Sequence, residues 1–249
     1  MDAYEAWEQV ARNHHAGTFP NDILRLIERQ LPASARFSAE TGCGKSTILL
    51  SNIADHHTVF CLDDRSLGDD SSINFYERCP LTQVERLHNV FGPTQVTLPA
   101  FRHTNKYDVV LLDGPHGWPY PELEYYFFYP HIVTGGLLIV DDCQIPTIGR
   151  MADILVEDDM WELVTIAETT AIFRRTDAPV FDPTGDLWWE QKYNRRRVSV
   201  RRDIYLADSP STDQISSLKL DAKLNGEAQI DDAPHGIRQG LSRLFRPRR

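Results

Sequence analysis

The sequence has few cysteines and no long apolar run. Its 249 residues contain only four cysteines (Cys43, Cys61, Cys79 and Cys143), and none of them lies in C-x-x-C spacing. This excludes a disulfide framework and disfavours a thiolate metal centre. No apolar stretch approaches the roughly 20 residues that a membrane-spanning helix needs. The first ten residues, MDAYEAWEQV, are acidic and amphipathic, which is unlike a secretory signal. Together these features predict a cytoplasmic protein with reduced thiols.

Basic residues are in the minority and are unevenly placed. The chain has 26 Lys and Arg against 36 Asp and Glu, a net charge of −10. Residues 192–249 carry 13 basic and 7 acidic residues, so residues 1–191 carry 13 and 29. Because an acidic body binds nucleic acid poorly, we expect no nucleic-acid partner. The basic tail is compatible with a weak membrane-surface or protein contact, which would make the protein membrane-peripheral, or with a solvated extension. The sequence leaves the oligomeric state open.

Segments typical of strands and helices alternate through the first 175 residues. Strands are predicted at 36–39, 58–62, 107–113 and 136–142, and a terminal antiparallel hairpin at 161–167 and 170–174. Helices are predicted at 4–14, 21–30, 46–54, 122–131 and 148–157. This order predicts a Rossmann-like α/β domain over residues 1–175, with a mostly parallel sheet covered by helices on both faces. An aromatic and basic appendage packing on the domain is expected at 176–205, and a flexible linker with a basic tail at 206–249.

The stretch ETGCGKSTI, at residues 40–48, is compatible with two kinds of cofactor site. Read from Ala39, it approximates a phosphate-binding loop in which Lys45 contacts phosphates and Ser46 a magnesium ion, as in a P-loop ATPase or kinase. Read from Glu40, it is an E-x-G-x-G turn at the end of a strand. The loop alone does not decide between these alternatives.

Acidic residues follow each predicted strand of the parallel sheet. They are Glu40, the pair Asp63 and Asp64, Asp113, and the pair Asp141 and Asp142. In open α/β sheets, ligands bind at the C-terminal ends of the strands. The phosphate-loop interpretation gives no role to either Asp pair, and it places the Glu40 carboxylate close to a triphosphate. The positions of the acids therefore favour the second interpretation.

The chain resembles the class I methyltransferases in four motifs. These are the E-x-G-x-G turn, the acid about 20 residues later, the D-G-x-H motif (Asp113 to His116) and the Asp141-Asp142 pair. These enzymes use S-adenosylmethionine (SAM), and the resemblance covers residues 36–174. It implies that Gly42 and Gly44 approach the methionyl part of SAM closely. It also implies a cofactor-binding set of Glu40, Thr41, Gly42, Gly44, Ser46, Asp63, Asp64, Gln95 and Asp113. Within that set, Asp63, with Asp64 as the fallback, would take the ribose hydroxyls, and Gln95 would contact the adenine.

The resemblance extends to metal-dependent O-methyltransferases of the catechol and macrolide-sugar types. It implies that Asp113, Asp141 and Asp142 hold Mg²⁺, or else Mn²⁺ or Ca²⁺, since an all-oxygen set suits a hard ion. His116 would act as the general base, with Asp113 beside it in the catalytic site. The predicted reaction is O-methylation of a hydroxyl on a small molecule or a glycan. The alternatives are the P-loop ATPase or kinase and a SAM-fold binding protein without catalysis.

Overall fold

The computed structural model describes residues 20–181, 185 and 187–196. The helix predicted at 4–14 and the tail predicted at 206–249 lie outside the described residues. The chain divides into two compact units, residues 1–194 and 195–249, and the sheet and the site belong to the first.

The described strands form one seven-stranded sheet in the order β3-β2-β1-β4-β5-β7-β6. They are β1 (Ala35–Thr41), β2 (Ala54–Cys61), β3 (Leu87–Phe91), β4 (Tyr107–Leu112), β5 (Ile132–Val140), β6 (Trp161–Ala167) and β7 (Thr170–Arg175). The pairs from β3 through β5 are parallel, whereas β7 is antiparallel to both β5 and β6. The prediction of a mostly parallel sheet with a terminal hairpin is confirmed.

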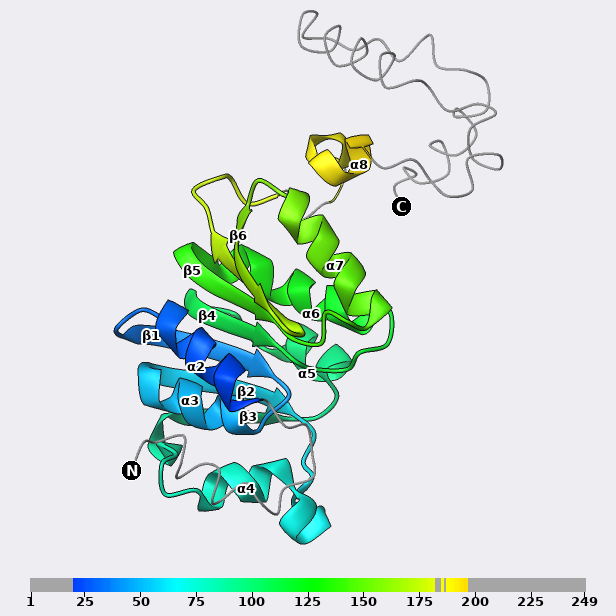
Figure 1. Cartoon of the computed structure of the whole chain (residues 1–249). Helices are drawn as coiled ribbons and strands as arrows, with labels where there is room; N and C mark the ends of the chain where they lie inside the picture. The colour runs from blue at the N-terminus through cyan, green and yellow to red at the C-terminus, as the bar shows by residue number, and fades with distance from the viewer. Residues whose placement is uncertain (1–19, 182–184, 186, 197–249) are drawn as a thin grey trace, which may run out of the picture. The chain divides into compact units, whose positions relative to one another are not determined.

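Helices cover both faces of this sheet (Figure 1). They are α2 (Asn21–Gln30), α3 (Lys45–Ile53), α4 (Ser72–Arg78), α5 (Thr94–Ala100), α6 (Tyr120–Phe128) and α7 (Pro146–Glu157). A further short helix, α8 (Lys192–Arg196), does not cover the sheet. Short 3-10 turns lie at Arg65–Asp70, Val84–Arg86, Tyr129–His131 and Trp188–Glu190. The first three helices pack with one face of the sheet in one apolar cluster, and α5, α6 and α7 pack with the other face in a second cluster.

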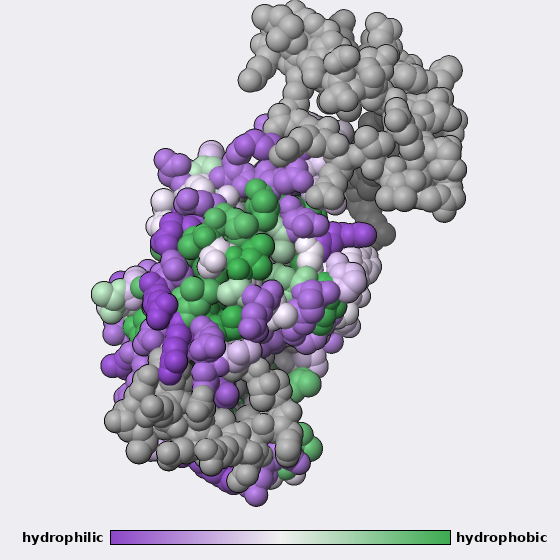
Figure 2. Space-filling view, viewed as in Figure 1, coloured by the Kyte–Doolittle hydropathy of each residue, from purple (hydrophilic) through white to green (hydrophobic). Residues whose placement is uncertain are grey.

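The apolar residues whose spacing predicts α2 form the buried face of that helix. Ile23, Leu24 and Ile27 all point into the core, and the helix has the bounds expected from the sequence. The central strands read as continuous apolar runs because both of their faces are covered. Figure 2 shows an apolar area over β5 and β6 on the face seen in Figure 1, bordered by hydrophilic side chains.

Parallel pairing brings the C-terminal ends of five strands to one edge of the sheet. Thr41 pairs with both Phe60 and Leu112, and Leu112 in turn pairs with Val140. The loops that leave these strands therefore converge, as the predicted site requires. In the described part of the chain no helix is long and apolar enough to cross a membrane.

The start of the predicted appendage contacts the domain. The Tyr129 hydroxyl donates a hydrogen bond to the Phe181 carbonyl at 3.2 Å, and Lys192 forms an ion pair with Asp159. These contacts join Phe181 and Lys192 to the domain.

Candidate functional site

A cavity of about 700 Å³ opens at the convergent edge of the sheet. Its lining comes from the loops after β1, β2, β3 and β4: Gly42, Cys43, Phe60, Cys61, Leu62, Asp64, Ser72, Gly92, Pro93, Thr94, Gln95, Asp113, Gly114, Pro115, His116 and Tyr120. This volume is typical of cofactor and small-molecule pockets. Of the predicted cofactor residues, Gly42, Asp64, Gln95 and Asp113 line the cavity, whereas Glu40, Thr41, Gly44, Ser46 and Asp63 do not.

Gly42 lies where only glycine fits. Its φ is +80°, and a Cβ there would come within 2.2 Å of the Asp113 carbonyl oxygen. Its N–H donates to the Phe60 carbonyl at 3.0 Å, which fixes the turn against β2. At Gly44, by contrast, an added Cβ would meet no atom within 4 Å, and its N–H donates to the Thr47 hydroxyl at 2.9 Å. The first glycine is therefore required by the crossing of two loops in the protein itself.

Glu40 lies beneath the loop and not in the cavity. It is fully buried, and its carboxylate accepts hydrogen bonds from Ser46 Oγ at 2.7 Å and from Thr47 Oγ1. His57 Nε2 lies 3.2 Å from the same carboxylate, and Ser38 Oγ lies 2.8 Å from His57 Nδ1. Glu40, which the resemblance places in the cofactor-binding set, therefore belongs to a buried network that holds the first turn of α3, and Ser46 belongs to the same network.

The two acids after β2 have different surroundings. Asp63 forms an ion pair with Arg65 at 2.6 Å, and the hydrogen bonds from that guanidinium lower its pKa to about 2. Asp64 lines the cavity, while its carboxylate accepts from Ser71 Oγ at 2.6 Å and from Ser72 N–H at 2.7 Å. The acid at the cavity is therefore Asp64, the second choice from the sequence.

Three side chains from the loops after β4 and β5 meet at the rim of the cavity. His116 Nε2 lies 3.1 Å from Asp142 Oδ2 and 3.8 Å from Asp113 Oδ1, and the possible ligand atoms of the three residues all lie within 4.8 Å of one another. Burial raises the pKa of Asp113 to about 6, and the neighbouring Asp141 and Asp142 add to the effect. The pKa of His116 is raised, first by Asp113 and then by Asp142, against the effect of its own burial.

Asp141 lies beside this cluster, but its carboxylate is held by other hydrogen bonds. Its Oδ1 accepts from Thr170 Oγ1 at 2.5 Å and from Thr169 Oγ1 at 3.4 Å. Asp142 has a φ of 57°, a left-handed conformation that Asp tolerates, and this turns its carboxylate towards His116. The structure therefore brings together Asp113, His116 and Asp142, and not the three acids expected from the sequence.

The parts of a phosphate-binding loop are not assembled. Lys45 Nζ donates to Asn21 Oδ1 at 3.5 Å and is not among the cavity residues. Ser46 is 4 % exposed and is bonded to Glu40. A buried carboxylate directly under the loop would also repel a triphosphate. The P-loop alternative is therefore not favoured.

The fold is that of a class I methyltransferase. Three features define it: the strand order with its terminal antiparallel strand, the glycine turn after β1 and the cavity at the strand ends. Residues 39–143 match the model of a family described as a methyltransferase domain. A search of curated proteins by sequence found no match.

Solved structures share this fold at low sequence identity. The O-methyltransferase TomG from Streptomyces achromogenes, involved in tomaymycin synthesis and solved with SAM, aligns with a TM-score of 0.54 at 16 % identity, over 69 % of this chain and 90 % of TomG. A Bacillus cereus O-methyltransferase in complex with SAH (S-adenosylhomocysteine) gives 0.52 at 15 %, over 71 % and 92 %. The SAH-bound methyltransferase PaMTH1 from Podospora anserina gives 0.53 at 12 %, over 71 % and 89 %. The fold is therefore that of the class I methyltransferases, and residues 39–143 match a methyltransferase domain.

Proposed function

We propose that this methyltransferase transfers the methyl group of SAM to a hydroxyl oxygen of a small molecule or a glycan. The observation that carries the proposal is the position of Asp113, His116 and Asp142 at the rim of the cavity. A general base and two carboxylates at that rim suit the deprotonation of a hydroxyl acceptor.

The residues that line the cavity fit SAM. Gly42 and Cys43 would hold the methionyl part, Asp64 the ribose hydroxyls and Gln95 the adenine edge. Gly42 and Cys43 border the cavity directly, so a cofactor there would contact the turn after β1. When bound, SAM supplies an electrophilic methyl group on a sulfonium. Glu40 and Ser46 would act indirectly, by fixing the turn from below.

A divalent ion fits the donors at the rim. Asp113 and Asp142 offer two carboxylates, and His116 a nitrogen, so the set suits Mn²⁺ as well as Mg²⁺. A bound ion would lower the pKa of an acceptor hydroxyl. Because His116 faces both carboxylates through the same Nε2, it would serve either as a third ligand or as the base. We assign it the role of base, with the two carboxylates left to hold the ion.

Radiolabelled methyl transfer from SAM to a panel of catechols, phenols and sugars, with and without EDTA, tests the proposal. We expect transfer to at least one hydroxyl acceptor, loss of transfer with EDTA and recovery with Mg²⁺ or Mn²⁺. Activity that is unaffected by EDTA would show that the reaction needs no divalent ion, and His116 would remain the proposed base. Transfer to amines or thiols, with none to hydroxyls, would contradict the proposed acceptor.

A further inference from the structure

One buried carboxylate takes no part in the cavity. Glu124, on α6, is 1 % exposed and lies on a helix whose other inward residues are apolar or aromatic. Its Oε2 accepts a hydrogen bond from Thr41 Oγ1 at 2.7 Å. Among the described residues, its Oε1 has no hydrogen-bond partner. Burial raises the pKa of this carboxyl to about 7.

Thr41 connects Glu124 to both loops of the site. Its hydroxyl oxygen accepts a hydrogen bond from the Asp113 N–H at 3.1 Å, while its own proton goes to Glu124. Thr41 is the last residue of β1 and directly precedes the cofactor loop, residues 42–44. Asp113 is the first residue of the catalytic loop, residues 113–117. Glu124 therefore orients the one hydroxyl that joins the starts of the two loops.

Two glycines mark the same junction. A Cβ at Gly42 would lie 2.2 Å from the Asp113 carbonyl oxygen, and a Cβ at Gly114 would lie 2.1 Å from Glu124 Oε1. The cofactor loop thus lies against the catalytic loop, and the catalytic loop against the Glu124 carboxylate, with no space for a side chain at either contact. Packing as well as hydrogen bonding sets the spacing of the loops.

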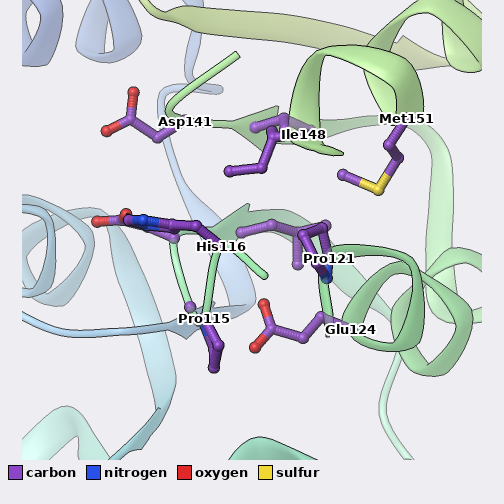
Figure 3. Close-up of a pocket in the computed structure, with 11 residues that line it drawn as sticks. Pro115, His116, Pro121, Glu124, Asp141, Ile148 and Met151 are labelled. Carbon is purple, nitrogen blue, oxygen red and sulfur yellow. The ribbon is translucent and has the colours of Figure 1, made fainter. Parts of the chain in front are cut away.

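Ligands cannot reach Glu124. The cavity beside it has a volume of about 10 Å³, enough for at most one water molecule, and its wall includes Pro115, His116 and Pro121 (Figure 3). Glu124 is absent from the lining of the 700 Å³ cavity. It therefore touches neither cofactor nor acceptor, and any role in the reaction is exerted through Thr41 and the loops.

Stability does not explain a carboxyl group at this position. A buried carboxylate with one unpaired oxygen costs free energy, and an apolar residue of similar volume at such a site is often neutral or stabilising. On α6 the neighbouring Phe128 packs into the same cluster without a polar group. The group is costly for the fold, which points to a role in the site.

We propose that Glu124 is a positioning residue that holds the cofactor loop and the catalytic loop in the alignment needed for methyl transfer. It does so by fixing the Thr41 hydroxyl as the acceptor for the Asp113 N–H and by supporting Gly114. The kinetic consequence rests on the proposed function. The positioning itself concerns the free protein and can be measured without an acceptor.

The test compares Glu124→Leu, which removes the acceptor, with Glu124→Gln, which retains an oxygen for Thr41. Amide hydrogen exchange is followed over residues 107–118, with residues 161–175 as the remote control. We expect Glu124→Leu to exchange about tenfold faster in 107–118 alone, with a Tm no more than about 2 °C below that of the wild type. Glu124→Gln should exchange like the wild type. Thr41→Val should reproduce the loosening, and adding Glu124→Leu to it should not increase it.

Two results would overturn the proposal. Wild-type exchange in 107–118 of Glu124→Leu would show that the carboxylate does not hold the loop. Faster exchange in both segments with a clearly lowered Tm would show that Glu124 stabilises the whole fold and does not act on the loops alone. If SAH does not bind the wild type, the proposed function fails, yet the exchange data still decide the positioning. With an acceptor in hand, Glu124→Leu should lower kcat about 10- to 100-fold and change the SAH Kd less than about threefold. Loss of SAH binding with an unchanged kcat would contradict the role in alignment.

Discussion

The acidic residues on the two sides of the site have different partners. On the side of β1 and β2, Glu40 is bound by hydroxyls and His57, Asp63 by Arg65, and Asp64 by Ser71 and the start of α4. On the side of β4 and β5, the carboxylates of Asp113 and Asp142 face each other across His116, and no Lys or Arg ion pair is formed with them among the described residues.

The difference separates acids that maintain the structure of a loop from acids that are available for the reaction. Carboxylates that are saturated by donors of the protein shape a loop and leave backbone and neutral surface for the cofactor. On the other side, burial and then the neighbouring acids raise the pKa of Asp113 to about 6, which suits this carboxyl to binding a proton or a cation. The comparison predicts that substitutions on the second side reduce turnover, whereas substitutions on the first reduce cofactor binding or folding.

The largest effect is expected for His116→Ala. Loss of the base should lower kcat by about 10²- to 10⁴-fold while the SAH Kd stays unchanged, because the imidazole is at the rim on the acceptor side. His56→Ala, which changes an exposed histidine on β2, is the matched control. Calorimetry with SAH and single-turnover methyl transfer measure the two quantities. A full-rate His116→Ala enzyme would remove this residue from the chemistry.

Asp142→Asn and Asp141→Asn separate the two members of the acid pair. We expect Asp142→Asn to weaken Mn²⁺ binding by about 100-fold, because it removes a charged ligand. Asp141→Asn should change it less than about tenfold, because Asp141 accepts a hydrogen bond from Thr170 and is not one of the three clustered residues. Titration with Mn²⁺ followed by electron paramagnetic resonance measures both affinities. Equal losses of Mn²⁺ affinity in the two variants would support the metal site of three acids that was expected from the sequence.

Gly42→Ala tests the other side of the comparison. The left-handed φ and the clash with the Asp113 carbonyl should cost about 1–3 kcal/mol, which corresponds to roughly 10- to 100-fold weaker SAH binding if the loop moves to accommodate the methyl group. Gly44→Ala, which meets no neighbouring atom, is the control for folding. Unaltered SAH binding by Gly42→Ala would show that the tight crossing is not needed for the cofactor.

Protonation of His116 in the metal-free protein gives the smallest and finest test. Because Asp113 and Asp142 raise the pKa of His116, its imidazolium persists to higher pH than that of a free histidine. An NMR titration of the metal-free protein should therefore give this ring an apparent pKa above the ordinary value of about 6.5. This midpoint belongs to the coupled group and not to His116 alone. Addition of Mg²⁺ should lower it, because the cation offsets the charge of the two carboxylates. An apparent pKa below 6 in the metal-free protein would contradict the coupling of His116 to the two carboxylates.

The sequence predicted the class of fold and the region of the site, but it did not locate β3, α4 or α5. Apolar periodicity located α2 and the buried strands, and the order of the elements predicted the sheet and its terminal hairpin. The acids after each strand indicated the edge where the cavity lies. These features depend on burial, which hydrophobic pattern records directly.

The choice between adjacent acids was beyond the sequence. Whether Asp141 or Asp142 faces His116 depends on one backbone angle at Asp142, and whether Asp63 or Asp64 reaches the cavity depends on the pairing of Asp63 with Arg65. His57 was missed because β2 begins at Ala54, four residues before the apolar run that predicts it. Glu124 was missed as well, although an acid among aromatic residues on a buried helix was a usable signal.

The most direct test of the account compares the effects of SAH and ATP·Mg²⁺ on thermal unfolding of the wild-type protein. At 100 times its Kd a ligand adds about 2.7 kcal/mol of stability, which is readily visible as a rise in Tm. We expect stabilisation by SAH and none by ATP·Mg²⁺, because the cavity is lined by Gly42, Asp64 and Gln95, and Lys45 lies outside it. Stabilisation by ATP·Mg²⁺ alone would show that this cavity is not a SAM site.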